Sequence, residues 1–79
     1  MYYVYILESK VDGSHYVGST SNLKNRLLAH NTGSARYSST KNPFVIIWYC
    51  AFRDKTMAIK FELYLKHGSG HSFVKKHLI

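Results

Sequence analysis

The first apolar segment, residues 2–7, alternates tyrosine with β-branched side chains, which is typical of a strand. Successive side chains of a strand point to opposite faces of a sheet. We therefore expect Tyr3 and Tyr5 on one face, and Val4 and Ile6 on the other.

A turn signal follows this strand. Asp12-Gly13 favours a two-residue hairpin turn, after which residues 15–18 are expected to return antiparallel to the first strand. This assignment gives Asp12 a local role in the turn. Glu8 is expected as a solvated acid at the end of the strand.

A helix is predicted over residues 23–32. The polar residues 19–22 supply candidates for its N-cap, and Gly33 suits the position just after its last turn. Leu23 and Leu27 are four residues apart, so both are expected to face the core.

The second half of the chain begins with a basic loop, residues 34–42. The next segment, residues 44–52, is continuously apolar, and this pattern indicates the most buried strand of the fold.

Two helices complete the pattern. Asp54 or Thr56 is expected to cap a helix over residues 57–67, residues 68–70 to break it, and residues 71–77 to form a short last helix. The order of elements indicates an α+β domain, with a small three-stranded antiparallel or mixed sheet flanked by helices.

The composition adds a strong positive charge to this picture. Eleven Lys and Arg residues stand against four Asp and Glu, a formal net charge of +7 on 79 residues. Such a charge favours a polyanionic partner, nucleic acid first and an acidic membrane surface second. The length indicates a single domain over residues 1–79.

Cysteine content and hydropathy exclude several classes of protein. The single cysteine, Cys50, rules out a disulfide framework or a zinc finger and indicates a reducing compartment. The longest apolar run, residues 44–52, is far shorter than the roughly 20 residues that span a bilayer. We therefore expect no membrane partner and a cytoplasmic location.

The scarcity of acids narrows any metal site. A two-metal nuclease needs several converging carboxylates, whereas three of the four acids here have expected roles at turns, caps or strand ends. Glu62 has none, and its place within a predicted helix suits a metal ligand. The alternative is an ordinary helix pair with Lys66, worth a few tenths of a kcal/mol.

Four further side chains suit phosphate chemistry. Arg26 and His30 are one helical turn apart, so a guanidinium can neutralise a phosphate beside an imidazole that moves a proton. Tyr5 and Tyr16, on the two strands of the hairpin, can complete an anion site. The alternatives are a solvated helix stripe for the first pair and half-buried core tyrosines for the second.

The remaining basic residues suit contacts to a nucleic-acid backbone rather than to bases. The candidates are Lys24, Arg36, Lys41, Lys75 and Lys76. His67 and His71 are four residues apart, but the glycines between them interrupt the helix that a zinc site would require.

These residues together resemble the GIY-YIG nuclease domain of homing endonucleases, of the excision-repair incision subunit and of some restriction enzymes. Residues 3–5 (Tyr-Val-Tyr) stand where the family has Gly-Ile-Tyr, and residues 16–18 (Tyr-Val-Gly) where it has Tyr-Ile-Gly. Arg26, His30 and Glu62 match the later motifs. The resemblance covers the whole chain and is strongest to the small stand-alone bacterial members.

The resemblance implies hydrolysis of phosphodiester bonds in DNA, with one Mg²⁺ or Mn²⁺ ion held by Glu62. Arg26 would offset charge that develops on the phosphate. Tyr5, relayed through His30, is our first choice for the base, with Tyr16 positioning the water. The resemblance leaves the choice of tyrosine open.

Two phosphate-binding positions of the repair branch differ in this chain. Ser19 stands where that branch has a lysine, and the late asparagine of many relatives has no counterpart. Ser19 is kept as a candidate for nucleic-acid contact, and Lys24 or the turn at residues 69–70 is a candidate to replace the lost contacts.

The leading hypothesis is therefore a metal-dependent endonuclease that acts on DNA structures or repair intermediates rather than on a sequence site. RNA stays open as a substrate, and a homodimer or a repair protein as a partner. One alternative is a nucleic-acid-binding module that kept the fold without turnover. Another is an interaction domain that recruits a repair partner through aromatic side chains.

Overall fold

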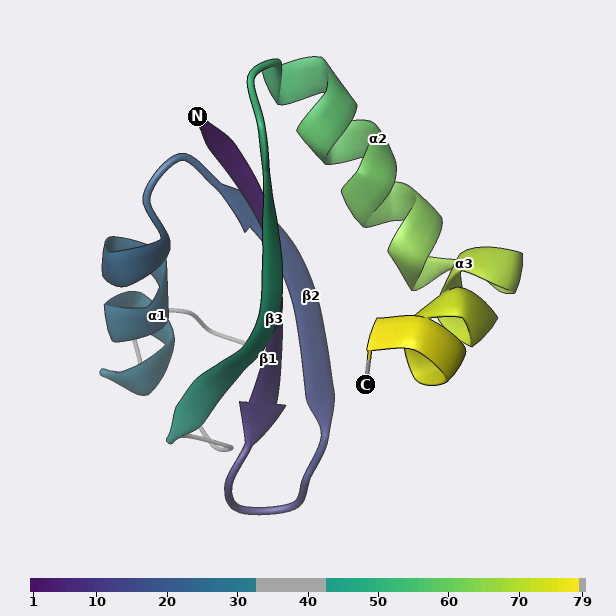
Figure 1. The fold of residues 1–79 in the computed structure, drawn as a ribbon. Helices are drawn as coiled ribbons and strands as arrows, with labels where there is room; N and C mark the ends of the chain where they lie inside the picture. The colour runs from purple at the N-terminus through teal and green to yellow at the C-terminus, as the bar shows by residue number, and fades with distance from the viewer. Residues whose placement is uncertain (33–42, 79) are drawn as a thin grey trace.

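The computed structural model describes residues 1–32 and 43–78. A three-stranded sheet in the order β2-β1-β3 forms the centre of the molecule, and both of its strand pairs are antiparallel. Helix α1 (Leu23–Asn31) lies on one face of this sheet, and α2 (Lys55–Lys66) lies on the other (Figure 1). The α+β fold predicted from the sequence is confirmed, and its sheet is antiparallel.

The hairpin forms as expected, but with a longer connection than two residues. Strand β1 (Tyr2–Ser9) ends and β2 (His15–Thr20) begins on either side of residues 10–14. Asp12 Oδ1 accepts the Ser14 N–H at 2.9 Å, and Gly13 has a positive φ of 75°. The Asp-Gly pair thus has its expected turn role. The Ser9 hydroxyl oxygen accepts further bonds from the N–H groups of Val11 and Asp12, which stabilise the longer turn.

The expectation that residues 44–52 are the most buried strand is wrong. Strand β3 (Phe44–Phe52) lies at an edge of the sheet, and Tyr49 on it is 57% exposed. The central strand is β1, where Val4 and Ile6 are fully buried. Burial follows position in the sheet, because only the central strand has a paired neighbour on each side and a helix over each face.

Strand β3 has a β-bulge at Ile47 and packs into the clusters on both faces of the sheet, and this two-sided packing explains why an edge strand is apolar throughout. The register steps from Ile6 opposite Trp48 to Leu7 opposite Ile46, so one residue of β3 is extra. Ile46 therefore packs in the cluster under α1, and Trp48 packs in the cluster under α2. Without the bulge, residues two apart would share one face.

The predicted helix after β2 is confirmed as α1. Asn22 is the N-cap, and its side-chain oxygen accepts the Asn25 N–H at 3.0 Å. Leu23 and Leu27 pack against the buried Tyr5 and neighbouring residues as expected. The proposed end at Gly33 and the basic loop at residues 34–42 lie outside the described residues.

Helix α2 begins at Lys55, two residues before the predicted start, because Asp54 is its N-cap and accepts the Thr56 N–H at 2.8 Å. The break lies at His67, whose backbone is extended. Residues 68–70 do not form the predicted break, since α3 (Gly68–Phe73) already begins there. A π-helical turn, η2 (Val74–Leu78), follows.

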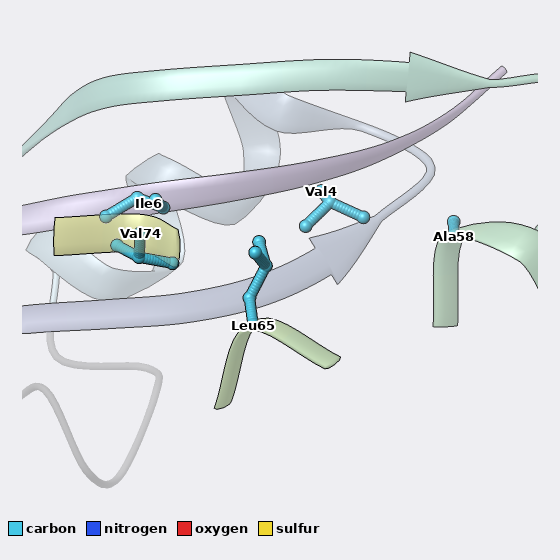
Figure 2. Close-up of a cluster of buried hydrophobic side chains, with 5 residues drawn as sticks. All are labelled: Val4, Ile6, Ala58, Leu65 and Val74. Atoms are coloured by element: carbon cyan, nitrogen blue, oxygen red, sulfur yellow. The ribbon is translucent and has the colours of Figure 1, made fainter. Parts of the chain in front are cut away.

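The main core cluster lies between the sheet and the C-terminal helices. Its buried members come from β1, α2 and η2 (Figure 2), and they are Val4, Ile6, Ala58, Leu65 and Val74. Ala58 and Leu65 are seven residues apart and so lie on one side of α2, where they fix this helix against the sheet. In the described part of the chain, no helix combines the length and apolar character needed to cross a membrane.

Candidate functional site

The phenol of Tyr5 lies at the centre of the candidate site. Tyr5 is only 1% exposed, because its strand is central and α1 covers this face. Arg26 Nε donates a hydrogen bond to the Tyr5 hydroxyl oxygen at 3.2 Å, and His30 Nε2 lies 3.4 Å from the same oxygen. The hairpin and α1 thus bring three of the predicted residues into direct contact.

Gly18 makes room for this phenol. Gly18 is paired with Tyr5 across the β1–β2 ladder, and Tyr5 lies over it so closely that an added Cβ would collide with the hydroxyl oxygen. The same Cβ would lie 2.7 Å from Cζ of Tyr5 and 3.2 Å from Cε1 of Tyr16. The glycine of the second motif is therefore required by close packing of the two tyrosines, since its φ is not among the positive ones.

His30 is fully buried, so the solvated-stripe alternative is wrong for this residue. Its ring lies 4.7 Å from the ring of Tyr16 and 5.8 Å from that of Phe44, both in edge-on arrangements. Burial lowers the pKa of His30, and the positive charge of Arg26 lowers it further. The imidazole is therefore a neutral group that packs against one motif tyrosine and meets the hydroxyl of the other.

Burial also decides the protonation of Tyr5. Loss of solvent raises the pKa of this phenol, and this effect outweighs the opposing hydrogen bond and charge of Arg26. The charge of Glu62 raises the same pKa further, which reflects its proximity. The role of base given to Tyr5 required a lowered pKa, so the protein's own residues leave Tyr5 protonated at neutral pH.

Glu62 points from α2 toward β2. Its Oε1 accepts a hydrogen bond from the Ser19 hydroxyl at 2.5 Å, and its Oε2 lies 2.7 Å from Nζ of Lys66. The helix pair with Lys66 that the sequence offered as an alternative therefore exists. It does not remove Glu62 from the site, because the ammonium of Lys66, its partner, lies 6.0 Å from the ring centroid of Tyr16, which in turn packs on His30.

Two hollows formed by described residues lie along the line where β2 faces α2, one on each side of the Glu62–Ser19 contact. The first, of about 220 Å³, includes Ser19, Thr20, Lys55 and Ile59 in its lining. The second, of about 310 Å³, includes His15, Tyr16, Lys66 and Lys75. We call this line the β2–α2 groove; basic side chains are found in both of its hollows.

Some of the predicted nucleic-acid contacts lie at this groove and others do not. Ser19 and Lys75 line its hollows. Lys24 is exposed on α1, on the other side of the sheet, and Lys76 is exposed on η2. Arg36 and Lys41 lie outside the described residues.

Two lysines of the groove are not among the nucleic-acid contacts predicted from the sequence. Lys55 was not considered, and Lys66 was considered only as a partner for Glu62. Lys55 comes seven residues before Glu62 and Lys66 four after, and this spacing places all three on one side of a helix. Helical spacing measured from Glu62 would have found them.

The donor set around Glu62 limits what kind of ion it can hold. Among the described residues, no three His, Cys, Asp or Glu side chains gather into a metal-binding group. A carboxylate with a neighbouring hydroxyl suits a hard cation such as Mg²⁺ or Mn²⁺, which completes its shell with waters and phosphate oxygens.

The chain is similar to small bacterial proteins. It is 38% identical over 71 residues to a UPF0213 protein of Lacticaseibacillus paracasei, covering 89% of this chain and 79% of the relative. It is 42% identical over 67 residues to the UPF0213 protein CPE1444 of Clostridium perfringens, covering 84% and 71% of the two chains.

A solved structure and a family model also match this chain. The solution NMR structure of the UPF0213 protein BH0048 from Bacillus halodurans has a TM-score of 0.58 to this fold at 35% identity, covering 99% of this chain and 87% of that one. A family model described as the GIY-YIG catalytic domain matches residues 1–75. The chain belongs to the GIY-YIG catalytic domain family.

Proposed function

We propose that the protein hydrolyses phosphodiester bonds of DNA with the help of one divalent metal ion at Glu62. The observation that carries this proposal is the contact network of Tyr5, Arg26 and His30. Tyr16 packs on His30, and the ammonium that pairs with Glu62 lies 6.0 Å from the Tyr16 ring, so the carboxylate adjoins this network. Membership in a family of nuclease domains supports the same activity.

Glu62 fits a metal ligand of the Mg²⁺ type. Its side chain is 16% exposed, so solvent and substrate oxygens can reach it, and Ser19 holds its orientation. Mg²⁺ is commonly bound by one or two carboxylates together with waters and substrate phosphates. When bound, such an ion supplies a positive charge for the scissile phosphate and for the leaving oxygen.

The chain's own residues have separate roles in this proposal. Arg26 neutralises charge on the phosphate, and the Tyr5 oxygen, which accepts from Nε, orients the guanidinium. Tyr16 is more exposed than Tyr5, so a water molecule can reach it, and we assign to Tyr16 the activation of the attacking water. This assignment replaces Tyr5 as the first choice for the base. His30 holds both phenols in place.

The β2–α2 groove supports a substrate that is recognised through its backbone. Lys55 and Lys75 in its two hollows suit phosphates on either side of the scissile one. Phosphate contacts carry no sequence information, so we propose branched, nicked or repair-intermediate DNA as the substrate. A cytoplasmic protein that acts alone, as a homodimer or with a repair protein would fit this role.

The test is a cleavage assay on labelled branched, nicked and single-stranded DNA, with an RNA strand of the same sequence alongside. The native protein should cut in Mg²⁺ or Mn²⁺ and stay inactive in a chelator. Glu62→Gln should be inactive, and Glu8→Gln, a matched change at an acid outside the site, should retain activity. Equal cleavage by Glu62→Gln would overturn the proposal.

A second candidate is a nucleic-acid-binding module without turnover. It is favoured by one observation, namely that both oxygens of Glu62 already have protein partners. Binding of DNA that falls with salt, is unaffected by Mg²⁺ and leads to no cleavage would support this candidate over the nuclease.

A further inference from the structure

Lys66 occupies the carboxylate that the proposed function assigns to the metal ion. Its ammonium lies 2.7 Å from Oε2 of Glu62, one helical turn away, and its side chain is 37% exposed. The sequence also places Lys60 on α2, but no ion pair of Lys60 with Glu62 is formed in the described part of the chain. Lys66 is therefore the cation that stands in the position of the metal.

In the same position, this ammonium also lies near Tyr16. Nζ of Lys66 lies 6.0 Å from the ring centroid of Tyr16, within the range of a cation–π contact. Lys66 also lines the larger hollow of the groove with His15 and Lys75. An ammonium released from Glu62 can thus turn toward Tyr16 without leaving the groove.

A divalent ion and an ammonium cannot both remain at one carboxylate oxygen, because they repel each other and compete for the same lone pairs. Ser19 donates to the other oxygen through a neutral hydroxyl. A hydroxyl can rotate to present its own lone pair to a cation, whereas the ammonium has none to offer. A divalent ion at Glu62 would therefore displace Lys66 and leave Ser19 in place.

We propose that Lys66 is a positioning residue that exchanges partners: it neutralises Glu62 in the metal-free protein and moves to a substrate phosphate beside Tyr16 once the ion binds. This inference rests on the proposed nuclease function. Because one lysine serves both states, metal and phosphate binding strengthen each other, and each binds weakly alone. Lys66 also supplies a positive charge near the motif position where the repair branch has a lysine and this chain has Ser19.

The first test measures Mn²⁺ binding without DNA, from the electron paramagnetic resonance signal of free Mn²⁺. Lys66→Met should bind Mn²⁺ about two- to five-fold more tightly than the native protein, the effect of removing one exposed ion pair. Lys66→Arg, which keeps the charge, should bind as weakly as native. Lys60→Met removes an equal charge from α2 without touching Glu62 and should change the affinity less than Lys66→Met does.

The outcomes separate this inference from the proposed function. Unchanged or weaker Mn²⁺ binding by Lys66→Met would overturn the exchange, while leaving the metal site at Glu62 intact. Native-like binding by Glu62→Gln would instead remove the metal site, and with it the proposed function.

A second measurement uses the native protein and does not depend on how a variant folds. In a sample labelled with ¹³C and ¹⁵N, addition of Mg²⁺ should shift the side-chain ammonium resonance of Lys66 and leave that of Lys60 in place. Mg²⁺ that shifts the Glu62 carboxylate resonance without moving Lys66 would contradict the exchange.

Discussion

The phenol of Tyr5 occupies the space that a side chain at position 18 would need. A Cβ at position 18 would collide with the phenol oxygen and ring carbon of Tyr5. Overpacking of this kind usually costs about 1–3 kcal/mol. Because the hydroxyl oxygen is the nearest of these atoms, a variant that lacks it relieves part of the collision.

We therefore expect Gly18→Ala to lower the free energy of unfolding by about 1–3 kcal/mol, and by less in a Tyr5→Phe background. Urea unfolding of the native protein, the two single variants and the double variant measures this coupling. Equal losses in both backgrounds would show that the phenol does not fill the space above Gly18.

The two tyrosines differ in what they can do for a water molecule. Tyr5 is buried with a raised pKa and accepts from Arg26, whereas Tyr16 lies at the more exposed edge. Tyr16→Phe should lower the rate of DNA cleavage by about 10²- to 10⁴-fold, the size of a general-base effect. Tyr5→Phe should lower it less. A single-turnover assay compares them, and a larger loss in Tyr5→Phe would reverse our assignment.

Because His30 is buried as a neutral imidazole, we expect the fold to lose stability in acid. Burial lowers its folded pKa below the ordinary value of 6.5, so the unfolded chain binds the proton more readily. The stability from neutral His30 is fully present above about pH 6.5 and is lost as the pH falls from there toward the folded pKa. When the pH is lowered from 7.5 to 5.5, the free energy of unfolding of the His30→Gln variant should therefore fall less than that of the native protein.

Urea unfolding at the two pH values measures this difference. His77→Gln, a change at an exposed histidine, serves as the matched control and should keep the native dependence. A His30→Gln variant that loses as much stability as the native protein would contradict a buried neutral imidazole.

At the scale of single residues, the sequence predicted which side chains meet better than it predicted their surroundings. It selected Tyr5, Arg26 and His30, and these three meet at one hydroxyl. It could not reveal that His30 is fully buried, because burial depends on Phe44 and Tyr16, which come from other strands. For the same reason it could not decide the protonation of Tyr5.

Among the secondary-structure elements, local signals located most of the helices and strands. Asn22 and Asp54 cap the two main helices through their own side chains, which is chemistry visible in a few neighbouring residues. The edge position of β3 in the sheet was not visible, since an edge strand that packs on both faces, as β3 does, is as apolar as a central strand. Strand order is a long-range property.

The cap of α2 offers a test at this scale. Asp54→Ala should lower the free energy of unfolding by about 0.5–2 kcal/mol, because the Thr56 N–H loses its acceptor. Thr56→Ala, at the other residue that the sequence offered as a cap, should cost less. Urea unfolding compares the two, and a larger effect at Thr56 would contradict the observed cap.

Considered as a whole, the molecule carries its excess of positive charge with few acids to offset it. Glu8 pairs with His15, Asp12 and Asp54 accept backbone N–H groups, and Glu62 is held within the groove. The net charge predicted a polyanionic partner. Only the fold shows that the hollows on either side of the Glu62 carboxylate are lined by Lys55, Lys66 and Lys75.

DNA binding in a chelator should therefore depend on where a lysine lies. Each of Lys55→Ala and Lys75→Ala should reduce the slope of log affinity against log salt by about 1. Lys24→Ala removes the same charge from α1, away from the groove, and should leave the slope closer to native. Titrations by fluorescence anisotropy over a range of salt provide the slopes, and equal effects at all three lysines would argue against the groove as the binding path.

The extra residue at Ile47 also determines where β3 can change in length. Ile47 is the one residue of β3 without a partner on β1, so its deletion would leave Trp48, Cys50 and Phe52 facing α2 and Phe44 in place. A deletion within the paired residues on either side of it would instead turn part of the strand to the opposite face. In an alignment of relatives, single-residue gaps in β3 should therefore fall at the bulge, while the hairpin connection at residues 10–14 is free to vary.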